Sequence, residues 1–171
     1  MYYSMERRHV NNVERDLLMI EFGKISLMKI LFVCWGNVGR SQMAAAIYNN
    51  MTKTHDADSA GTEVDVPGES LLMRAGRTDG IYIINAMDSV GIDVRRSKRT
   101  QLEQSMLNKY DYVISMADKK HSPSWLRSNS NYIYWHITDP GGKDYQTTLQ
   151  VMQTIKRKVE KLISTGIQIG R

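Results

Sequence analysis

One stretch of eight residues combines a thiol, a guanidinium group, a hydroxyl and two glycines at a spacing that suits anion chemistry. It begins with the last residue of the apolar run ILFVC and reads Cys34-Trp35-Gly36-Asn37-Val38-Gly39-Arg40-Ser41. Glycine and asparagine adopt positive φ more readily than other residues, so successive backbone N–H groups can turn towards one point. A helix starting at Ser41 would aim its positive end at the same point. The stretch therefore predicts a cradle for an oxyanion.

Cys34 is placed to attack an anion bound in this cradle. The helix end, Arg40 and the Ser41 hydroxyl all favour the thiolate, which is the nucleophilic form of cysteine. Arg40 can also donate two hydrogen bonds to two oxygens of a tetrahedral dianion. A lone cysteine is more often a small buried hydrophobic side chain, but the Arg-Ser pair and the two glycines favour a reactive thiol. We therefore predict that Cys34 is a nucleophile and Arg40 an anion ligand.

The composition excludes several other kinds of site. Cys34 is the only cysteine in 171 residues, which excludes internal disulfides and zinc sites built from several thiolates. The four histidines do not occur in pairs at ligand spacing, so we expect no structural metal. The net charge of +5 favours anionic partners. Aromatic residues do not alternate with basic ones as on a nucleic-acid platform, and the apolar runs are much shorter than the ~20 residues of a membrane span. We expect neither nucleic acid nor a membrane as a partner.

The N-terminal residues differ in pattern from the rest of the chain. Residues 1–28 hold four basic and four acidic side chains and show only a faint helical spacing of apolar residues. They lack the basic start, apolar middle and small-residue cleavage site of a secretory signal. We expect residues 1–27 to be an extension and residues 28–171 to form the catalytic domain.

The remainder alternates strand and helix patterns. Strands are expected over residues 29–34, 57–60, 110–116 and 131–137, and helices over residues 41–52, 81–90, 100–109 and 145–163. Residues 62–80 predict a long loop, and the basic run 95–99 predicts a solvated one. This order predicts an α/β fold, with a four-stranded parallel sheet flanked by helices on both faces and the phosphate-binding loop after the first strand. Ligands of such sheets bind at the carboxyl ends of the strands.

The segment ILFVCWGNVGRSQMAAAI resembles the signature of the low-molecular-weight protein tyrosine phosphatases, whose fold the thioredoxin-coupled arsenate reductases share. The similarity covers roughly residues 28–165, with an apparent insertion within residues 68–85. It implies a four-stranded parallel sheet, no metal and no cofactor. It also implies roles for five residues: a nucleophile (Cys34), a phosphate ligand (Arg40), a brace of the loop (Asn37), a hydroxyl that stabilises the thiolate (Ser41) and a general acid (Asp139). The other positions of the loop, Trp35, Gly36, Val38 and Gly39, complete the phosphate-binding set.

Three features depart from the usual phosphatase pattern. Gly39 stands where many family members carry a second cysteine, so no neighbouring thiol protects Cys34 from over-oxidation. Two glycines follow Asp139-Pro140 where tyrosine phosphatases usually place an aromatic residue, and Trp35 is a candidate for that wall. The segments RSQMA and DPGGK resemble the arsenate reductase branch at least as closely. That branch relays electrons through further cysteines that this chain lacks, which leaves only a reductase served by an external thiol.

We therefore predict a cytoplasmic, cysteine-dependent phosphomonoester hydrolase that acts through a phosphocysteine intermediate. A protein tyrosine phosphatase is the leading hypothesis, with a phosphorylated protein or a small phosphomonoester as substrate. A thiol-coupled arsenate reductase is the main alternative, and a non-catalytic oxyanion-binding module is a third. A Cys–His hydrolase built from Cys34 and His136 would leave Arg40 without a role.

Overall fold

The structure, a computed structural model, describes residues 28–77 and 80–165. The expected extension, residues 1–27, lies outside the described residues, and so does a small part of the expected insertion. The C-terminal residues 166–171 also lie outside the described residues.

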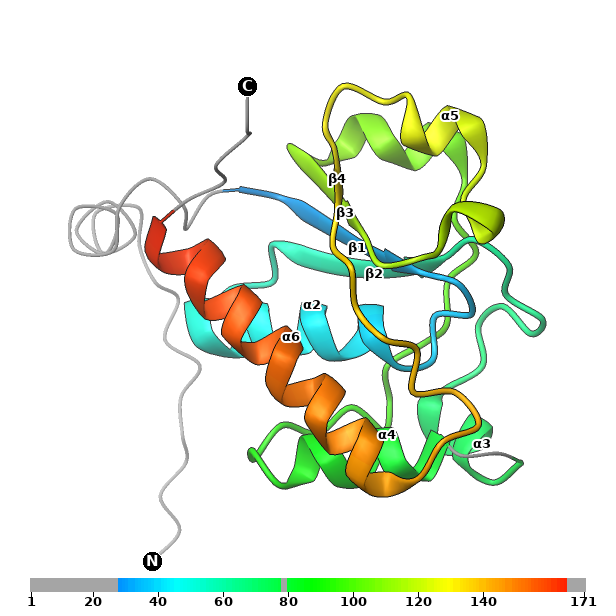
Figure 1. Cartoon of the computed structure of the whole chain (residues 1–171), viewed down its shortest axis with the longest axis vertical. Helices are drawn as coiled ribbons and strands as arrows, with labels where there is room; N and C mark the ends of the chain where they lie inside the picture. Colours follow the sequence, from blue (N-terminus) through cyan, green and yellow to red (C-terminus); the bar gives the residue numbers. More distant parts are fainter. Residues whose placement is uncertain (1–27, 78–79, 166–171) are drawn as a thin grey trace, which may run out of the picture.

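Four parallel strands form one sheet at the centre of the described chain (Figure 1). Its order is β2 (Ala57–Gly61), β1 (Ile30–Cys34), β3 (Tyr112–Ser115) and β4 (Tyr132–Tyr134). Every residue of β1 is buried, as a continuous apolar run on a central strand requires. The predicted fold class is confirmed. Because the strands are parallel, their carboxyl ends meet at one edge, and Cys34 is the last residue of β1 at that edge.

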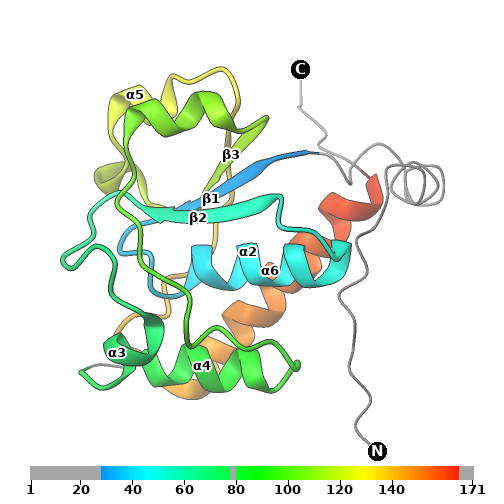
Figure 2. The ribbon, with the colours of Figure 1, turned by 180° about the vertical axis from the view of Figure 1, so that it is seen from behind.

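Helices cover both faces of the sheet, as Figures 1 and 2 show from opposite sides. Ile30 and Phe32 pack with the larger cluster, which includes side chains of α2 (Arg40–Thr52), α4 (Gly80–Asp88) and α6 (Tyr145–Thr165). Leu31 and Val33 point the other way, because neighbouring side chains of a strand alternate between faces. The smaller cluster that they join includes side chains of the 3₁₀ helix η2 (Gln104–Lys109) and of α5 (Ser124–Arg127).

The long helix α6 packs through the apolar stripe that its sequence contains. Its buried residues recur at spacings of three and four, which puts them on one face of the helix: Thr148, Val151, Met152, Ile155, Val159 and Leu162. This face packs on α2 and α4. The helix predicted over residues 145–163 is therefore confirmed, with its end two residues later.

Two predictions for the segments between the strands are wrong in part. Residues 62–80 are not all loop, since α3 (Leu71–Ala75) forms there with the Ser70 side chain accepting the N–H of Met73 as an N-cap. The helix expected over residues 100–109 begins only at Gln104, as the 3₁₀ helix η2. The preceding residues are extended because their backbone bonds to Gly61: the N–H of Gly61 donates to the carbonyl of Thr100, and the N–H of Leu102 to that of Gly61.

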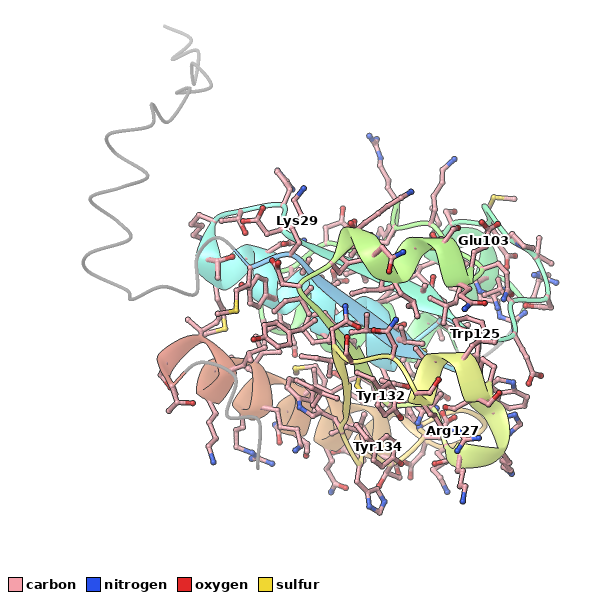
Figure 3. All side chains as sticks on the ribbon, turned by 90° about the horizontal axis from the view of Figure 1, so that it is seen from above. Lys29, Glu103, Trp125, Arg127, Tyr132 and Tyr134 are labelled. Atoms are coloured by element: carbon pink, nitrogen blue, oxygen red, sulfur yellow. The ribbon has the colours of Figure 1, made fainter. Side chains whose placement is uncertain are left out.

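The sheet also has a shorter edge strand than expected. Figure 3 shows β4 with Tyr132 and Tyr134 along it, beside Trp125 and Arg127 of α5. The strand predicted over residues 131–137 ends at Tyr134, after which the N–H of Trp135 donates the last bond to the carbonyl of Ser115. The short helices η3 (Lys119–His121) and α5, which follow β3, were not predicted. None of the helices within the described ranges is both long and apolar enough to cross a membrane.

Gly61 is the residue that lets β2 approach the loop after β1. It pairs with Cys34 in the sheet register, and a Cβ atom on it would lie 2.6 Å from the carbonyl oxygen of Trp35 and 2.8 Å from the nitrogen of Asn37. Both contacts are with backbone, which cannot swing aside as the end of a side chain can. A side chain here would push the loop away from the sheet.

We predict that Gly61→Ala lowers the free energy of unfolding by about 1–3 kcal/mol, the usual result of overpacking. Urea denaturation measures the change. Gly76→Ala is the matched control, because Gly76 has helical φ and its added Cβ would find only an ordinary 3.5 Å contact. The control should stay within about 1 kcal/mol of the wild type. Equal stability of the two variants would contradict the prediction.

Candidate active site

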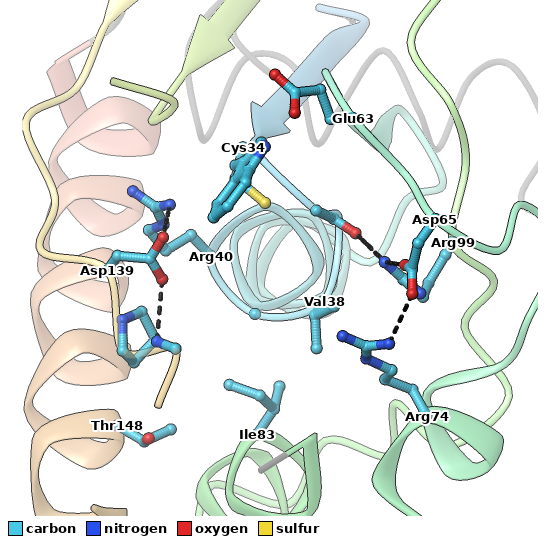
Figure 4. Close-up of a pocket in the computed structure, with 15 residues that line it drawn as sticks. Cys34, Val38, Arg40, Glu63, Asp65, Arg74, Ile83, Arg99, Asp139 and Thr148 are labelled. Atoms are coloured by element: carbon cyan, nitrogen blue, oxygen red, sulfur yellow. Dashed lines mark hydrogen bonds and ion pairs between the residues drawn. The ribbon is translucent and has the colours of Figure 1, made fainter. Parts of the chain in front are cut away.

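The eight-residue stretch forms a turn from the end of β1 into α2. Cys34 ends the strand, α2 starts at Arg40, and Gly39 is the helix N-cap residue. Asn37 has φ 51°, the left-handed conformation that the sequence pattern predicted for this loop. The same prediction is wrong for the two glycines, since Gly39 has φ −107° and Gly36 does not have positive φ either. A cavity of about 370 Å³ opens over the turn (Figure 4). Six residues of the stretch line it, namely Cys34, Trp35, Gly36, Val38, Gly39 and Arg40.

Behind the cavity, a chain of hydrogen bonds orients the thiol. The Sγ atom of Cys34 lies 3.0 Å from the Oγ atom of Ser41. The amide of Asn37 donates to the same Oγ atom at 2.8 Å, so the Ser41 hydroxyl accepts from Asn37 and its own hydrogen is available to Cys34. A second bond from the Asn37 amide, 3.0 Å long, reaches Ser59 on β2. The hydroxyl of Ser41 can therefore donate its own hydrogen to the sulfur of Cys34.

The carbonyl side of Asn37 is held as firmly as its amide. The side-chain oxygen accepts the backbone N–H of Thr100 at 2.7 Å and the side chain of Gln42 at 3.3 Å. Gln42 also donates to the backbone oxygens of Asn37 and Lys98. Thr100 and Gln42 were not predicted to take part, and no feature of the local sequence indicates their role.

Arg40 connects the loop to the ends of two other strands. Its Nη1 atom donates to the carbonyls of Met116, just after β3, and Ile137, beyond β4, at 2.6 and 3.2 Å. Its Nη2 atom forms an ion pair with Asp139, drawn in Figure 4. Among the described residues, Nε–H and the second N–H of Nη2 bond to nothing. These two N–H groups remain available to an anion that enters the cavity.

Asp139 reaches the same cavity from the chain after β4. Its Oδ2 atom faces Arg40, and its Oδ1 atom accepts the N–H of Gly141 at 3.0 Å. The side chain is 44% exposed, so it borders the cavity and solvent together. The structure thus brings Cys34, Arg40 and Asp139 to one cavity, as expected from the parallel sheet. His136 is not among the residues that line it; this histidine is exposed and stacks on Tyr134.

Trp35 forms one wall of the cavity. The indole stacks on the imidazole of His121, with ring centroids 4.0 Å apart and planes inclined by 23°. Glu63 contacts the residues of both rings. Its N–H donates to the carbonyl of Trp35 at 3.0 Å, and its carboxylate lies 3.5 Å from Nδ1 of His121. The hydrogen bond from the Trp35 side chain, with help from His121, holds the pKa of Glu63 below its usual range. Trp35 is 41% exposed and is therefore held at the surface rather than in the core.

The wall of the cavity that faces Arg40 and Asp139 contains charged residues that the sequence did not predict to lie there. Arg99, Arg74 and Asp65 line the cavity on the far side of α2 from Arg40 and Asp139 (Figure 4). The prediction that residues 95–99 form a solvated loop is wrong for Arg99, whose side chain is 1% exposed. Arg99 is buried because its charge is paired with the equally buried Glu69. Burial alone would raise the pKa of Glu69, but bonds from Arg77 and Arg99 outweigh it and leave the pKa below its ordinary value.

No group of three or more His, Cys, Asp or Glu side chains in the described part of the chain could hold an ion.

Comparison with known proteins agrees with this geometry. The family model described as low molecular weight phosphotyrosine protein phosphatase matches residues 29–169, most of the chain. The chain belongs to this family. The match includes the whole loop from Cys34 to Ser41 and the Asp139 segment.

The relatives of this family member carry two different activities in their names. An arsenate reductase of Brevibacillus brevis is 27% identical over 140 residues, which span 80% of this chain and 95% of the relative. A solved low molecular weight protein tyrosine phosphatase from T. tengcongensis superposes with a TM-score of 0.66 at 24% identity, covering 80% of this chain and 97% of that one. An arsenate reductase solved in a phosphate binding state gives a TM-score of 0.65 at 26% identity, with 82% and 100% covered. The fold and family are common to both activities.

The contact between Ser41 and Cys34 generates a prediction about the reactivity of the thiol. Ser41→Ala removes the donor that favours the thiolate, and a hydrogen bond to a charged group contributes about 1.5–3 kcal/mol. We expect alkylation of Cys34 by iodoacetamide at neutral pH to slow by roughly tenfold, since only the thiolate reacts. Mass spectrometry follows the reaction at a single site, because the chain has one cysteine.

Ser59→Ala is the matched control for this experiment. Ser59 bonds to Asn37 through the same amide but does not contact the sulfur. Ser59→Ala should therefore change the alkylation rate of Cys34 much less than Ser41→Ala does. Equal effects of the two substitutions would show that the hydroxyl of Ser41 does not act on Cys34.

Proposed function

We propose that this protein is a cysteine-dependent phosphomonoester hydrolase with aryl phosphates such as phosphotyrosine as its substrates. The observation that carries the proposal is the convergence of Cys34, Arg40 and Asp139 on one cavity. A phosphate placed there meets a nucleophile, a two-pronged anion ligand and a carboxyl group that can exchange protons. A catalytic thiol without a protective partner also fits the reducing conditions of the cytoplasm, where we place the enzyme.

In the first step, the thiolate of Cys34 attacks phosphorus. An S–P bond forms, the bond from phosphorus to the leaving oxygen breaks, and a proton from Asp139 neutralises that oxygen. Arg40 and the amides of the loop stabilise the equatorial oxygens, and such preorganised donors contribute a few kcal/mol each, about 2.7–4. The dianion competes with Asp139 for Arg40.

In the second step, water releases the phosphate. Asp139, now ionised, accepts a proton from a water molecule that attacks the phosphocysteine. The S–P bond breaks, inorganic phosphate leaves and the thiolate of Cys34 is restored with its bond from Ser41. The same carboxyl group thus acts as acid and then as base.

The walls of the cavity favour an aromatic leaving group. Trp35 presents an aromatic face held by His121, and Val38 and Ile83 add apolar surface. Aromatic pairs contribute about 0.5–1.5 kcal/mol beyond the area that they bury. Trp35 therefore takes the place of the aromatic residue that is missing after Asp139-Pro140.

Arsenate reduction is the second candidate, and the names of the curated relatives favour it. In that reaction Cys34 would attack arsenic, with loss of water, to give a thiol–arsenate adduct. One external thiol would attack the sulfur of Cys34 and release arsenite, and a second would reduce the resulting disulfide. Both electrons must come from outside the chain, because Cys34 is its only cysteine.

Steady-state kinetics with two substrates test the hydrolase. Cys34→Ser should abolish phosphate release from p-nitrophenyl phosphate. Asp139→Asn should lower kcat/KM, which reports the first step alone, by about 10²–10⁴ for phenyl phosphate, the usual contribution of a general acid. It should lower kcat/KM much less for p-nitrophenyl phosphate, whose leaving group needs little protonation. An equal effect of Asp139→Asn on both substrates would show that Asp139 is not the acid.

The same preparation given arsenate and glutathione separates the two candidates. The hydrolase proposal expects phosphate release that depends on Cys34, and arsenite formation no faster than with Cys34→Ser. Thiol-dependent arsenite formation without any phosphatase activity would overturn it in favour of the reductase.

A separate prediction concerns Trp35. Trp35→Ala should raise KM for phosphotyrosine by about two- to tenfold, which corresponds to the aromatic contribution above, with kcat little changed. Phosphoserine, which has no ring, is the control substrate and should show no such increase. If Trp35→Ala raised KM by the same factor for both substrates, the indole would support the loop and not the ring of the substrate.

A further inference from the structure

The backbone carbonyl of Gly36, at the centre of the anion-binding loop, is held by a buried arginine from a distant part of the chain. Arg99 donates to it twice, through Nε at 3.1 Å and Nη2 at 2.8 Å. The two residues are 63 positions apart. The contact therefore depends on the tertiary fold and not on the loop sequence.

The other side of the Arg99 guanidinium group is fixed by two carboxylates. Nη1 donates to Glu69 at 2.9 Å, and Nη2 pairs with Asp65 at 2.5 Å. Each carboxylate has a further arginine: Glu69 pairs with Arg77 at 2.5 Å and Asp65 with Arg74 at 2.9 Å. Positive and negative groups thus alternate along this row, and Figure 4 shows the part of it from Arg99 through Asp65 to Arg74.

The backbone of residues 98–100 is fixed against both the loop and the segment that carries the carboxylates. The N–H of Arg99 donates to the carbonyl of Glu69, and the carbonyl of Arg99 accepts the N–H of Gly68. Next to it, the N–H of Thr100 holds the side chain of Asn37, and the carbonyl of Lys98 accepts from Gln42. Arg99 therefore cannot shift without disturbing contacts on either side.

Holding the Gly36 carbonyl also sets the direction of an amide. The peptide group is planar and trans, so the N–H of Asn37 points opposite to the carbonyl of Gly36. Fixed donors stabilise a bound anion without the cost of reorienting them. We propose that Arg99 is a positioning residue, which presets the anion-binding loop through the Gly36 carbonyl and is itself held by Glu69 and Asp65. The proposal rests on the proposed function in that the bound anion is the phosphate of the substrate.

Arg99 acts through the loop and not as a second ligand of the anion. Four of its five N–H groups are used by Gly36, Glu69 and Asp65. Its positive charge is also balanced by the two carboxylates. Arg40, by contrast, keeps two N–H donors for the anion. Arg40 and Arg99, which both border the cavity, therefore have different roles.

The test measures phosphate binding directly, so that it does not depend on turnover. Inorganic phosphate should protect Cys34 from iodoacetamide, and the concentration that halves the alkylation rate gives an apparent Kd. Arg99→Gln should raise this Kd by about tenfold or more, since charge-assisted hydrogen bonds are lost. Arg99→Lys keeps one positive donor and should lie between Arg99→Gln and the wild type. Arg96→Gln, an exposed neighbour in the same basic run, is the matched control and should leave Kd unchanged.

A second variant keeps the proposal testable if the Arg99 variants do not fold. Glu69→Gln leaves Gly36 and Arg99 in contact but removes one of the two charges that hold Arg99, the buried one, so Kd should rise by a smaller factor. Circular dichroism and urea midpoints identify the folded variants. In the double variant with Arg99→Lys, the effect of Glu69→Gln on Kd should shrink, because both act through one contact.

Two results would overturn the proposal. One is a wild-type Kd for phosphate in folded Arg99→Gln. The other, decisive if the Arg99 variants are unfolded, is a wild-type Kd in Glu69→Gln. A protein that binds phosphate tightly but hydrolyses no aryl phosphate would contradict the proposed function and leave the role of Arg99 measurable by the same assay.

Discussion

Asn37 is the residue on which the geometry of the site depends. It is fully buried, has a left-handed backbone, and has all its side-chain hydrogen-bonding groups in use. A buried amide with an unmade hydrogen bond would be costly, so its partners must be in place whenever the loop has this shape. These partners come from α2, from β2 and from the segment before η2. The loop from Cys34 to Ser41 therefore takes this shape only where three parts of the chain meet, and the same contacts place the Ser41 hydroxyl beside the sulfur of Cys34.

Arg40 couples the loop to the opposite end of the site. Its bonds to the carbonyls of Met116 and Ile137 tie the loop after β1 to the chain after β3 and β4. The same guanidinium group, the candidate anion ligand, also forms an ion pair with Asp139, the candidate acid. Three arginines and three carboxylates line the cavity: Arg40, Arg74 and Arg99 with Glu63, Asp65 and Asp139. Each of these arginines is paired with a carboxylate of the cavity, so an anion has to compete with Asp139 for Arg40 and also gains the positive end of α2.

Structure that depends on residues close together in the sequence could be predicted, whereas contacts between residues far apart in the sequence could not. The strand ILFVC, the turn after it and the start of α2 could be predicted, because eight consecutive residues carry the pattern. Arg99 could not, since its partner Gly36 is 63 residues away and the surrounding basic run looks like a solvated surface. The extended residues 100–102 were predicted as helix because their bonds to Gly61 are not visible in a local pattern. Asp139 was placed correctly because the carboxyl ends of parallel strands share one edge.

The two reactions considered under the proposed function differ in their second step. Both would begin with the thiolate of Cys34 attacking a tetrahedral oxyanion held by the loop and Arg40. Hydrolysis then needs a proton acceptor beside a water molecule, and Asp139 lies at the cavity with one oxygen held by Gly141. Reduction needs further thiols, and this chain has one cysteine, which the first step consumes. Gly39, the position where a second thiol would lie nearest, is closely packed: a Cβ on it would meet Ile83 at 2.9 Å. The chain thus supplies every group that hydrolysis requires from a protein, whereas reduction would have to draw its thiols from another molecule.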